Sequence, residues 1–378
     1  MTPRERMLAA MTVGAPEVPA APLYLGLYLA PMRRRLRLQR YERLLDAAQR
    51  RPVSFDEEAR LSLHVHRRGY EVFASPPDWC EAPLGPARAS VNGAALLRRN
   101  GRLYWASPDG TLQDLGAQPA ECIGAWWTPV RSVSDLPNQV PETRPEDIVE
   151  AGHTLLTRRI VESLGGEYCI VASVGTPFWG AYGLLGFTGL MEAIHDAPHH
   201  LLEAIARFVP YRLAHVKALR SAGVDVIFVE SCLESADVLS PTQFRTFSLP
   251  YLRRLLNGIR ELGLPCVLYF CGDPRDRLEC LRELPCDALA FEESKKGFTV
   301  DIGEVRERIG DDKTLFGNVD VRLVRDGSPD VIRAEVQRQV RAAGAGGKFV
   351  VSVGSPLTLD TPPVKVDVLV EAAHAASP

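Results

Sequence analysis

The apolar residues of the second half of the chain fall into short runs with a regular spacing. From about Gly166, runs of β-branched and other apolar residues alternate with polar or glycine turns and with longer helical stretches. This alternation is typical of parallel strands that are covered by helices. The predicted strands are 168–174, 224–230, 265–271, 288–292, 314–318 and 348–353, with two weaker candidates upstream at 22–27 and 70–74.

Helical stretches separate these runs, and several begin with a start signal. The pairs Ser240-Pro241, Ser328-Pro329 and Thr361-Pro362 place a capping residue or an early proline where a helix begins. The predicted helices cover 190–222, 241–262, 301–310, 329–345 and 361–376. Eight strand–helix units predict an α/β fold, a (β/α)8 TIM barrel, and we expect it to occupy residues 1–378 as one domain.

Residues 85–140 interrupt the alternation. They are rich in Gly, Pro and short alternating runs, and Asp109-Gly110 lies between two such runs, where it favours a hairpin turn. The segment therefore predicts an inserted β-hairpin lobe within the barrel domain, and we expect the lobe to cover one mouth of the barrel.

Composition narrows the choice of partners and of cellular compartment. With 44 basic and 47 acidic residues and a formal charge of -3, the chain has no overall electrostatic drive toward nucleic acid. The longest apolar run, 19–32, is too short for a bilayer, and the charges of MTPRERMLAAM interrupt any secretory signal. Eight cysteines without a CxxC pair indicate reduced thiols. We expect a cytoplasmic protein that binds a small molecule and neither nucleic acid nor a membrane.

Candidate chemistry lies at the C-terminal ends of the predicted strands, where barrels of this kind form their active sites. The polar residues there are mostly acidic and include one thiol. Such a ring can hold a metal, bind a cationic group or exchange protons, and composition does not choose among these. The candidates are Glu230, Ser231, Cys271, Asp273, Glu292, Glu293, Asn318, Asp320, Ser352 and Ser355.

Aromatic and basic residues add candidates for ligand binding. TPFWGAY directly follows the predicted strand 168–174, so Phe178, Trp179 and Tyr182 should face the site and stack on a planar ligand. The cluster Arg33, Arg34 and Arg35 either serves an anionic ligand or forms a solvated helix face.

Several segments in this order resemble the uroporphyrinogen decarboxylase (URO-D) superfamily. They are PRERMLAAM near the start, SPTQFRTFSLPYLRRL at 240–255, FCG at 270–272, FGNVDV at 316–321 and VVSVGSPLTLDTPPVKVDVLVEA at 350–372. The superfamily includes porphyrinogen decarboxylases and zinc-dependent methyltransferases that act on methylated corrinoid proteins. The resemblance covers most of the chain and implies the barrel fold, with a homodimer as one expected assembly.

The decarboxylase branch implies binding roles for two residues. Ser231 matches the family's Ser, and Tyr182 lies one residue from the expected Tyr. However, YLGLYLAPMRRR does not reproduce the arginine-glutamine-glycine signature of this branch, and Ser355 stands where the family has a late His. This branch implies metal-independent decarboxylation of a porphyrinogen-like or small carboxylate substrate.

The methyltransferase branch binds zinc through His-x-Cys and a later Cys, and the metal makes a bound thiol nucleophilic. The matching positions here are Tyr269, Cys271 and Ser355, so only Cys271 is retained, and Glu230 is a second candidate zinc ligand. SPDGTLQDL and WWTPVRSVSDL resemble the hairpin lobe of this branch. The resemblance therefore implies methyl transfer between a corrinoid protein and a small acceptor.

Three hypotheses follow for the function. In the first, methyl transfer, Glu230, Cys271 and Asp273 form the reactive end, the aromatic residues line the substrate, and Glu292 supports them. The second is decarboxylation with Ser231 and Tyr182 on the substrate, and the third is a barrel that binds a ligand without catalysis. In each case Asn318 and Asp320 either orient the substrate or cap the next turn.

Overall fold

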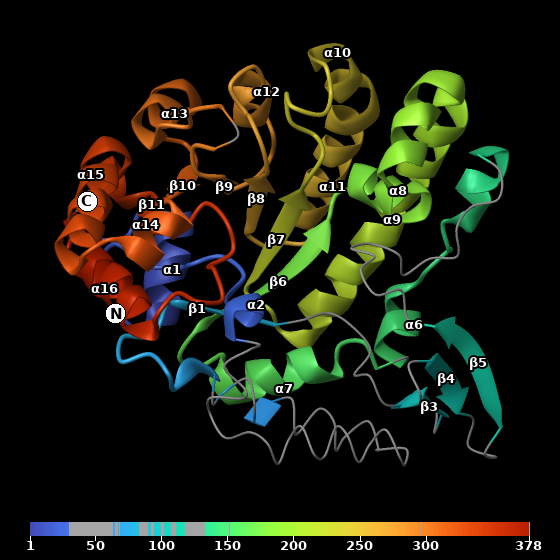
Figure 1. Ribbon diagram of the computed structural model, residues 1–378, viewed down its shortest axis with the longest axis horizontal. Coiled ribbons are helices and arrows are strands. Elements are labelled where there is room, and N and C mark those ends of the chain that lie inside the picture. The colour runs from blue at the N-terminus through green and yellow to red at the C-terminus, as the bar shows by residue number, and fades with distance from the viewer. Residues whose placement is uncertain are drawn as a thin grey trace.

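A computed structural model describes residues 1–29, 63–64, 67, 69–82, 90–91, 94–99, 102–106, 111–117, 133–150, 152–295 and 297–377. Its main feature is a curled sheet of seven parallel strands with helices on its outer side (Figure 1). The order β1-β6-β7-β8-β9-β10-β11 follows the chain, as expected for successive strand–helix units. The strands are β1 (Trp79–Glu81), β6 (Cys169–Gly175), β7 (Val226–Ser231), β8 (Cys266–Phe270), β9 (Ala288–Phe291), β10 (Thr314–Phe316) and β11 (Phe349–Val350).

A short extended segment around Ala20 lies between the two edge strands of this sheet. Ala20 forms a parallel bridge with Val351, and its carbonyl accepts the backbone N–H of Asp78 at 2.8 Å. The curled sheet together with this segment gives a TIM-barrel-like α/β architecture, as the alternation of runs predicts.

A buried carboxylate joins the two ends of the chain at this seam. Asp78 accepts the backbone N–H of Ala20 at 2.7 Å and an ion pair from Arg6, and its other contact is His374 Nε2 at 2.8 Å. The side chain of Asp78 is fully buried. The first helix, the start of β1 and the last helix therefore share one hydrogen-bonded centre.

The helices begin where the sequence places capping residues. Thr176 and Ser328 each accept a backbone N–H of the first turn, and Ser240 does so within a capping box with Gln243. The helices are α1 (Pro3–Met11), α2 (Leu25–Leu29), α6 (Pro145–Glu150), α7 (Leu155–Leu164), α8 (Pro177–Asp196), α9 (Pro198–Ala222), α10 (Pro241–Gln243), α11 (Leu249–Glu261), α12 (Leu278–Arg282), α13 (Ile302–Ile309), α14 (Val321–Asp326), α15 (Pro329–Ala343) and α16 (Pro363–His374). Shorter helical turns are η1 (Val133–Gln139), η2 (Phe244–Ser248) and η3 (Ala345–Gly347).

Two of these helices depart from a regular α-helix. The helix α8 breaks at Gly186, whose φ of 67° lies in the left-handed region that glycine adopts readily. The turn η2 is a π-helix that joins α10 to α11, so the predicted helix 241–262 is continuous but carries one wide turn. The predicted helices 301–310, 329–345 and 361–376 are confirmed within a few residues, although Thr361-Pro362 precedes a helix that starts at Pro363 without a side-chain cap. The predicted helix 190–222 is instead the end of α8 and the whole of α9, which are separated at Ala197.

The six strands predicted from 168 onward are confirmed, but both weaker candidates upstream are wrong. Residues 22–27 turn at Tyr24 into the helix α2, and the segment that joins the sheet lies earlier, at Ala20. Residues 70–74 form a turn whose buried rings pack into the core, and the strand β1 follows only after two prolines. Both short elements are set by tertiary contacts rather than by a local apolar run.

The inside of the sheet is filled with aromatic rings. The ring of Phe228 lies 5.9 Å from that of Trp79 and 5.6 Å from that of Tyr269, and Trp79 lies 5.5 Å from Phe316. These rings close the interior below the carboxyl ends of the strands, so polar side chains gather above them.

Within the predicted lobe 85–140, a separate antiparallel sheet contains β2 (Ser90–Val91), β3 (Ala94–Arg99), β4 (Arg102–Ala106) and β5 (Leu112–Ala117). Figure 1 shows this small sheet at one corner of the molecule, apart from the parallel sheet. The pair Asp109-Gly110 and the cluster Arg33 to Arg35 lie outside the described residues. The extent of the lobe and its placement over a barrel mouth stay predictions.

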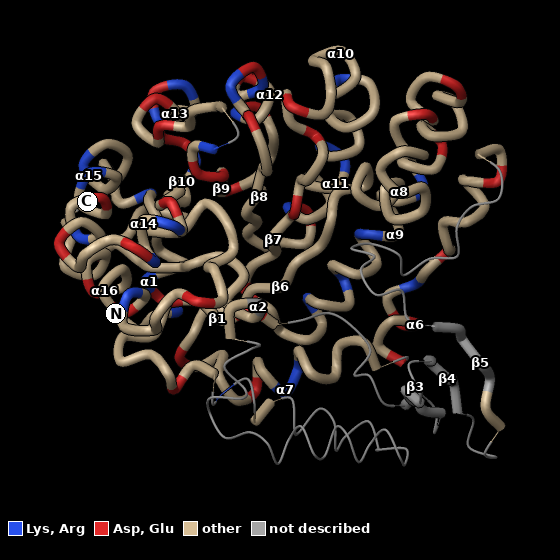
Figure 2. Tube along the Cα trace, in the orientation of Figure 1, with Lys and Arg blue, Asp and Glu red and all other residues tan. Residues whose placement is uncertain are grey.

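Charges on the outer helices are mixed. Basic and acidic residues alternate along α12, α13 and α15 (Figure 2). In the part of the chain that the structure describes, no helix is both long and apolar enough to cross a membrane.

Candidate active site

Successive side chains on β7 point to opposite faces of the sheet, and this separates Glu230 from Ser231, which the sequence analysis grouped together. Glu230 pairs in register with Tyr269 on β8, whose ring packs on Phe228 inside the sheet, so Glu230 faces inward. Ser231 therefore faces outward, where its hydroxyl donates to Glu234 at 2.9 Å. The structure thus places Ser231 away from Glu230, in a buried hydrogen-bond network.

That network has a structural role. Glu234 is fully buried and accepts hydrogen bonds from Ser231, from Thr176 and, at 2.6 Å, from Ser248. Thr176 caps α8, and Ser248 is in the π-turn η2. Glu234 therefore ties the end of β7 to two neighbouring helices.

Tyr24 lies at the centre of the inward-facing group. Its φ of 56° is unusual for a residue with a side chain, and its ring lies 5.9 Å from both Phe228 and Tyr269. Burial raises the pKa of Tyr24, and the neighbouring charge of Glu230 raises it further, so the hydroxyl stays protonated. Strained backbone of this kind is concentrated at functional sites.

The carboxyl group of Glu81 lies at the end of β1, close to Tyr24. It accepts the backbone N–H of Leu25 at 3.0 Å and that of Gly26 at 3.1 Å. Burial raises the pKa of Glu81 to about 7, and the charge of Glu230 contributes to this rise. At neutral pH Glu81 therefore carries a proton roughly half of the time.

Glu230 is the second carboxyl group of this pair. Burial raises its pKa, while the facing hydroxyls of Tyr24 and Ser173 and the charge of Arg212 lower it by smaller amounts. Two interacting carboxyl groups in one buried environment are a recurrent arrangement for acid–base catalysis. The sequence analysis identified Glu230 but missed Glu81, because β1 follows two prolines and lies upstream of the regular alternation of strand–helix units.

Two thiols meet beside the carboxyl pair. Cys232 Sγ and Cys271 Sγ are 3.1 Å apart, and both residues are partly exposed. The hydrogen bond with Cys232 and then burial raise the pKa of Cys271, so it is a thiol at neutral pH. Cys232 was missed, although it stands two residues after Glu230 and thus on the same face.

The predicted acidic mouth contains a cation that the sequence analysis did not foresee. Lys295 Nζ lies 2.6 Å from Glu292 Oε1 and 3.9 Å from Glu293 Oε1, and it donates to Ser355 at 2.6 Å. Ser355 in turn donates to Glu293 at 2.8 Å. The two carboxylates after β9 therefore share one cation of the protein itself.

Two further predicted residues near β10 have structural partners. The side-chain amide of Asn318 donates to the backbone carbonyls of Glu292 at 3.1 Å and Val300 at 2.9 Å. Asp320 caps α14 by accepting the N–H of Arg322 at 2.8 Å, and it forms an ion pair with the same arginine. Of the two roles considered for Asp320, capping is the one observed.

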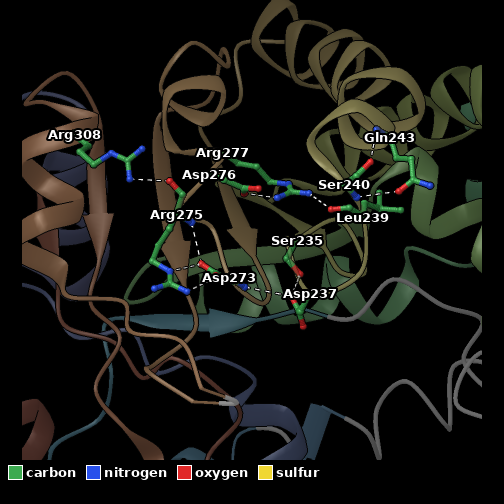
Figure 3. A network of polar contacts seen from close by, with 10 residues as sticks. All are labelled: Ser235, Asp237, Leu239, Ser240, Gln243, Asp273, Arg275, Asp276, Arg277 and Arg308. Carbon is green, nitrogen blue, oxygen red and sulfur yellow. Dashed lines mark hydrogen bonds and ion pairs between the residues drawn. The ribbon is translucent and has the colours of Figure 1, made fainter.

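Asp273, predicted to be at the reactive end, belongs to a polar network at the rim (Figure 3). Its carboxylate pairs with Arg275 at 2.6 Å, and this contact holds the pKa of Asp273 below its usual range. In the same network, Arg277 contacts Asp276 and the carbonyl of Leu239. Asp273 therefore stabilises the loop after β8 and does not join the carboxyl pair.

The aromatic candidates on α8 divide into two environments. Phe178 is buried in an apolar cluster with residues of α9, so it is core rather than a ligand contact. Trp179 and Tyr182 are partly exposed, with ring centroids 4.6 Å apart. A Cβ atom at Gly175 would lie 2.7 Å from Trp179 Cδ1, so the glycine provides room for that ring beside the end of β6.

Comparison with known proteins identifies the family. A family model described as uroporphyrinogen decarboxylase (URO-D) matches residues 127–376. The chain belongs to the uroporphyrinogen decarboxylase family. The uroporphyrinogen decarboxylase of Alkalilimnicola ehrlichii is 29% identical over 362 residues, which cover 89% of this chain and 94% of that protein. That of Serratia proteamaculans is 30% identical over 316 residues, which cover 79% and 83%.

A solved structure of a methyltransferase from Methanosarcina mazei has the same fold. It covers 99% of this chain and 98% of its own, with a TM-score of 0.62 and 21% sequence identity. The family model and the curated relatives confirm the resemblance of the sequence, whereas a homodimer and a corrinoid partner stay predictions.

The donor set of this URO-D family member does not fit the zinc site of the methyltransferase branch. Among the described residues, no three His, Cys, Asp or Glu side chains gather around one point. Tyr269 donates its hydroxyl to the carbonyl of Gly354 at 2.8 Å, and Ser355 is engaged by Lys295. Cys271 and Glu230 are therefore not completed to a zinc tetrahedron, and we derive no step through a metal.

Proposed function

We propose that this URO-D family member is a decarboxylase of a small organic acid, with Glu81 as the proton donor. The observation that carries the proposal is the buried carboxyl pair. Glu81, with a pKa of about 7, lies within electrostatic reach of Glu230 and has Tyr24 beside it. A group that titrates near neutral pH can both hold and release a proton under working conditions.

Decarboxylation requires such a group at one step. The bond between the carboxylate and its carbon breaks, carbon dioxide leaves, and the electron pair that remains on carbon takes up a proton. In this proposal Glu81 delivers that proton and is reprotonated from solvent. Glu230 raises the pKa of Glu81 and so favours its protonated form before the transfer.

The comparisons support the reaction class more than the substrate. The relatives that cover most of this chain are named uroporphyrinogen decarboxylase. The chain nevertheless lacks the arginine-glutamine-glycine signature of that branch, and Ser231, its matching serine, points away from the carboxyl pair. We therefore propose a carboxylic acid smaller than a porphyrinogen.

A second candidate function is methyl transfer with a corrinoid protein as partner. The thiol pair favours it, because Cys232 and Cys271 place two sulfur atoms beside Tyr269 at the strand ends. In this alternative a thiol that has lost its proton would attack the methyl group and become a thioether, while the bond between the methyl group and the corrinoid would break and leave its electron pair on the corrinoid. The high pKa of Cys271 disfavours the required thiolate.

One experiment separates the two candidates. Purified protein is incubated with uroporphyrinogen and with a panel of small carboxylates, and released carbon dioxide is measured by mass spectrometry. Glu81→Gln should reduce turnover about 10²- to 10⁴-fold, the usual contribution of a general acid. Glu283→Gln, an exposed carboxylate on the outer surface, is the matched control.

Methyl transfer is tested in parallel by the absorbance of methylcobalamin in the presence of thiol acceptors. Demethylation that Cys271→Ser abolishes, without carbon dioxide from any substrate, would replace the decarboxylase proposal with the second candidate.

A further inference from the structure

An arginine without a charged partner lies beside the carboxyl pair. Arg212 projects from α9, and it has neither an ion pair nor a hydrogen bond among the described residues. Its Nε is buried, while the side chain as a whole is half-buried. Its contacts are two aromatic rings, with Cζ 5.8 Å from the centroid of Phe208 and 5.5 Å from that of Tyr211.

A second buried arginine, Arg306, shows what a structural role requires. Arg306 donates to the carbonyls of Ala343 at 3.1 Å, Gly310 at 2.7 Å and Lys348 at 2.7 Å. A guanidinium is always charged and carries five N–H donors, so burying it without acceptors is costly. Among the described residues, Arg212 has two cation–π contacts and the more distant charge of Glu230 to offset this cost, and no acceptor for its N–H groups, which indicates an acceptor that arrives with a ligand.

The position of Arg212 relates it to the proposed chemistry. A Cβ at Gly175 would lie 3.4 Å from Arg212 Nη2 and 2.7 Å from Trp179, so the missing side chain leaves room for both groups. Gly175 is paired in register with Glu230. Arg212 is within electrostatic reach of Glu230 and lowers its pKa, although the two do not form an ion pair.

We propose that Arg212 binds a carboxylate of the substrate, the one that is not lost, and that Trp179 and Tyr182 pack against a planar body. Arginine suits this role because its planar fork matches the two oxygens of a carboxylate. The inference rests on the proposed function and names its substrate class as a planar acid with at least two carboxylates. One carboxylate is held at Arg212, and the other lies near Glu81.

A binding measurement tests the site without turnover. Isothermal titration calorimetry compares benzoate with benzamide, which has the same shape but no charge. Benzoate should bind the wild-type protein, and benzamide should bind at least about tenfold more weakly, because the charge-assisted hydrogen bonds are lost. Arg212→Gln should weaken benzoate roughly 10- to 100-fold.

Two further variants make the result specific. Arg207→Gln removes a charge from the same helix, where Arg207 pairs with Glu203 at 2.7 Å, and it should bind benzoate like the wild type. Arg212→Lys keeps the positive charge but lacks the planar guanidinium with its paired N–H donors, so it should bind benzoate more tightly than Arg212→Gln and more weakly than the wild type. Thermal melting of each variant shows that it is folded.

The outcomes distinguish this inference from the proposed function. The carboxylate site at Arg212, here called the anion site, is overturned if benzoate does not bind the wild type. It is also overturned if benzoate binds Arg212→Gln as tightly as the wild type. If carbon dioxide is released with an unchanged KM in Arg212→Gln, the anion site fails and the decarboxylase stands. If benzoate binds through Arg212 and no acid is decarboxylated, the anion site stands and the decarboxylase fails.

Discussion

Replacing Glu81 with Gln should change how the stability of the protein depends on pH. Burial and the charge of Glu230 raise the pKa of Glu81 from 4.5 to about 7. Between these values the folded protein binds more protons than the unfolded chain, so the free energy of unfolding falls as pH rises. At about 1.36 kcal/mol per pKa unit, the whole difference corresponds to about 3 kcal/mol, of which about 2.5 kcal/mol is lost between pH 5 and pH 8.

The variant Glu81→Gln is neutral at every pH and should lose this component. Both oxygens of Glu81 accept backbone N–H groups, those of Leu25 and Gly26. In the variant an NH2 group replaces one of these oxygens, so one of the two hydrogen bonds is lost. That loss lowers stability by about 1–3 kcal/mol at all pH values. The test therefore compares how steeply the free energy of unfolding changes with pH, and not its value at any single pH.

Urea unfolding followed by circular dichroism at pH 5, 6, 7 and 8 gives this slope. The difference in unfolding free energy between wild type and Glu81→Gln should change by about 2.5 kcal/mol across the range, in the direction that favours the variant at high pH. Glu283→Gln is the control and should follow the wild type. Parallel curves for wild type and Glu81→Gln would refute the reasoning, because Glu81 would then be ionised throughout.

Further predictions concern activity, the thiol pair and the cation Lys295. Turnover should fall as pH rises through about 7, because Glu81 must be protonated to donate, and a flat pH–rate profile would contradict this role. Diamide should join Cys232 to Cys271, and peptide mass spectrometry should find a disulfide that Cys232→Ala lacks; a different linkage would contradict the observed proximity. Lys295→Met leaves two buried carboxylates without their cation and should lower the unfolding free energy by about 3 kcal/mol in urea titrations, whereas the exposed control Lys217→Met should change it little.

The sequence predicts the later strands well for a physical reason. Strands buried on both faces need continuous apolar runs, and those of β6 to β9 are long enough to read directly, whereas the shorter β10 and β11 follow from the regular spacing of the strand–helix units. The first strands lack this signal. The segment at Ala20 and the strand β1 are held by Asp78 and by the seam between distant parts of the chain, which no local pattern records.

The candidate site was only partly predictable. Glu230 and Cys271 follow from the ends of apolar runs, and strict alternation would already have excluded Ser231 and included Cys232. Arg212 comes from the middle of a helix, and its lack of a partner is visible only in three dimensions. The sequence lists the carboxylates at the strand ends, but it does not show which of them form ion pairs with Lys295 or Arg275.

The seam at Asp78 has a consequence for how the molecule is made. Arg6 and Ala20 leave the ribosome more than 300 residues before Val351 and His374, with which they share this seam. Their contacts with Asp78 can form early, but Ala20 waits for more than 300 further residues before its neighbour on the other side, Val351, exists. The sheet can close only after Val351 has emerged, and release of a shorter nascent chain leaves an unpaired sheet edge open to aggregation.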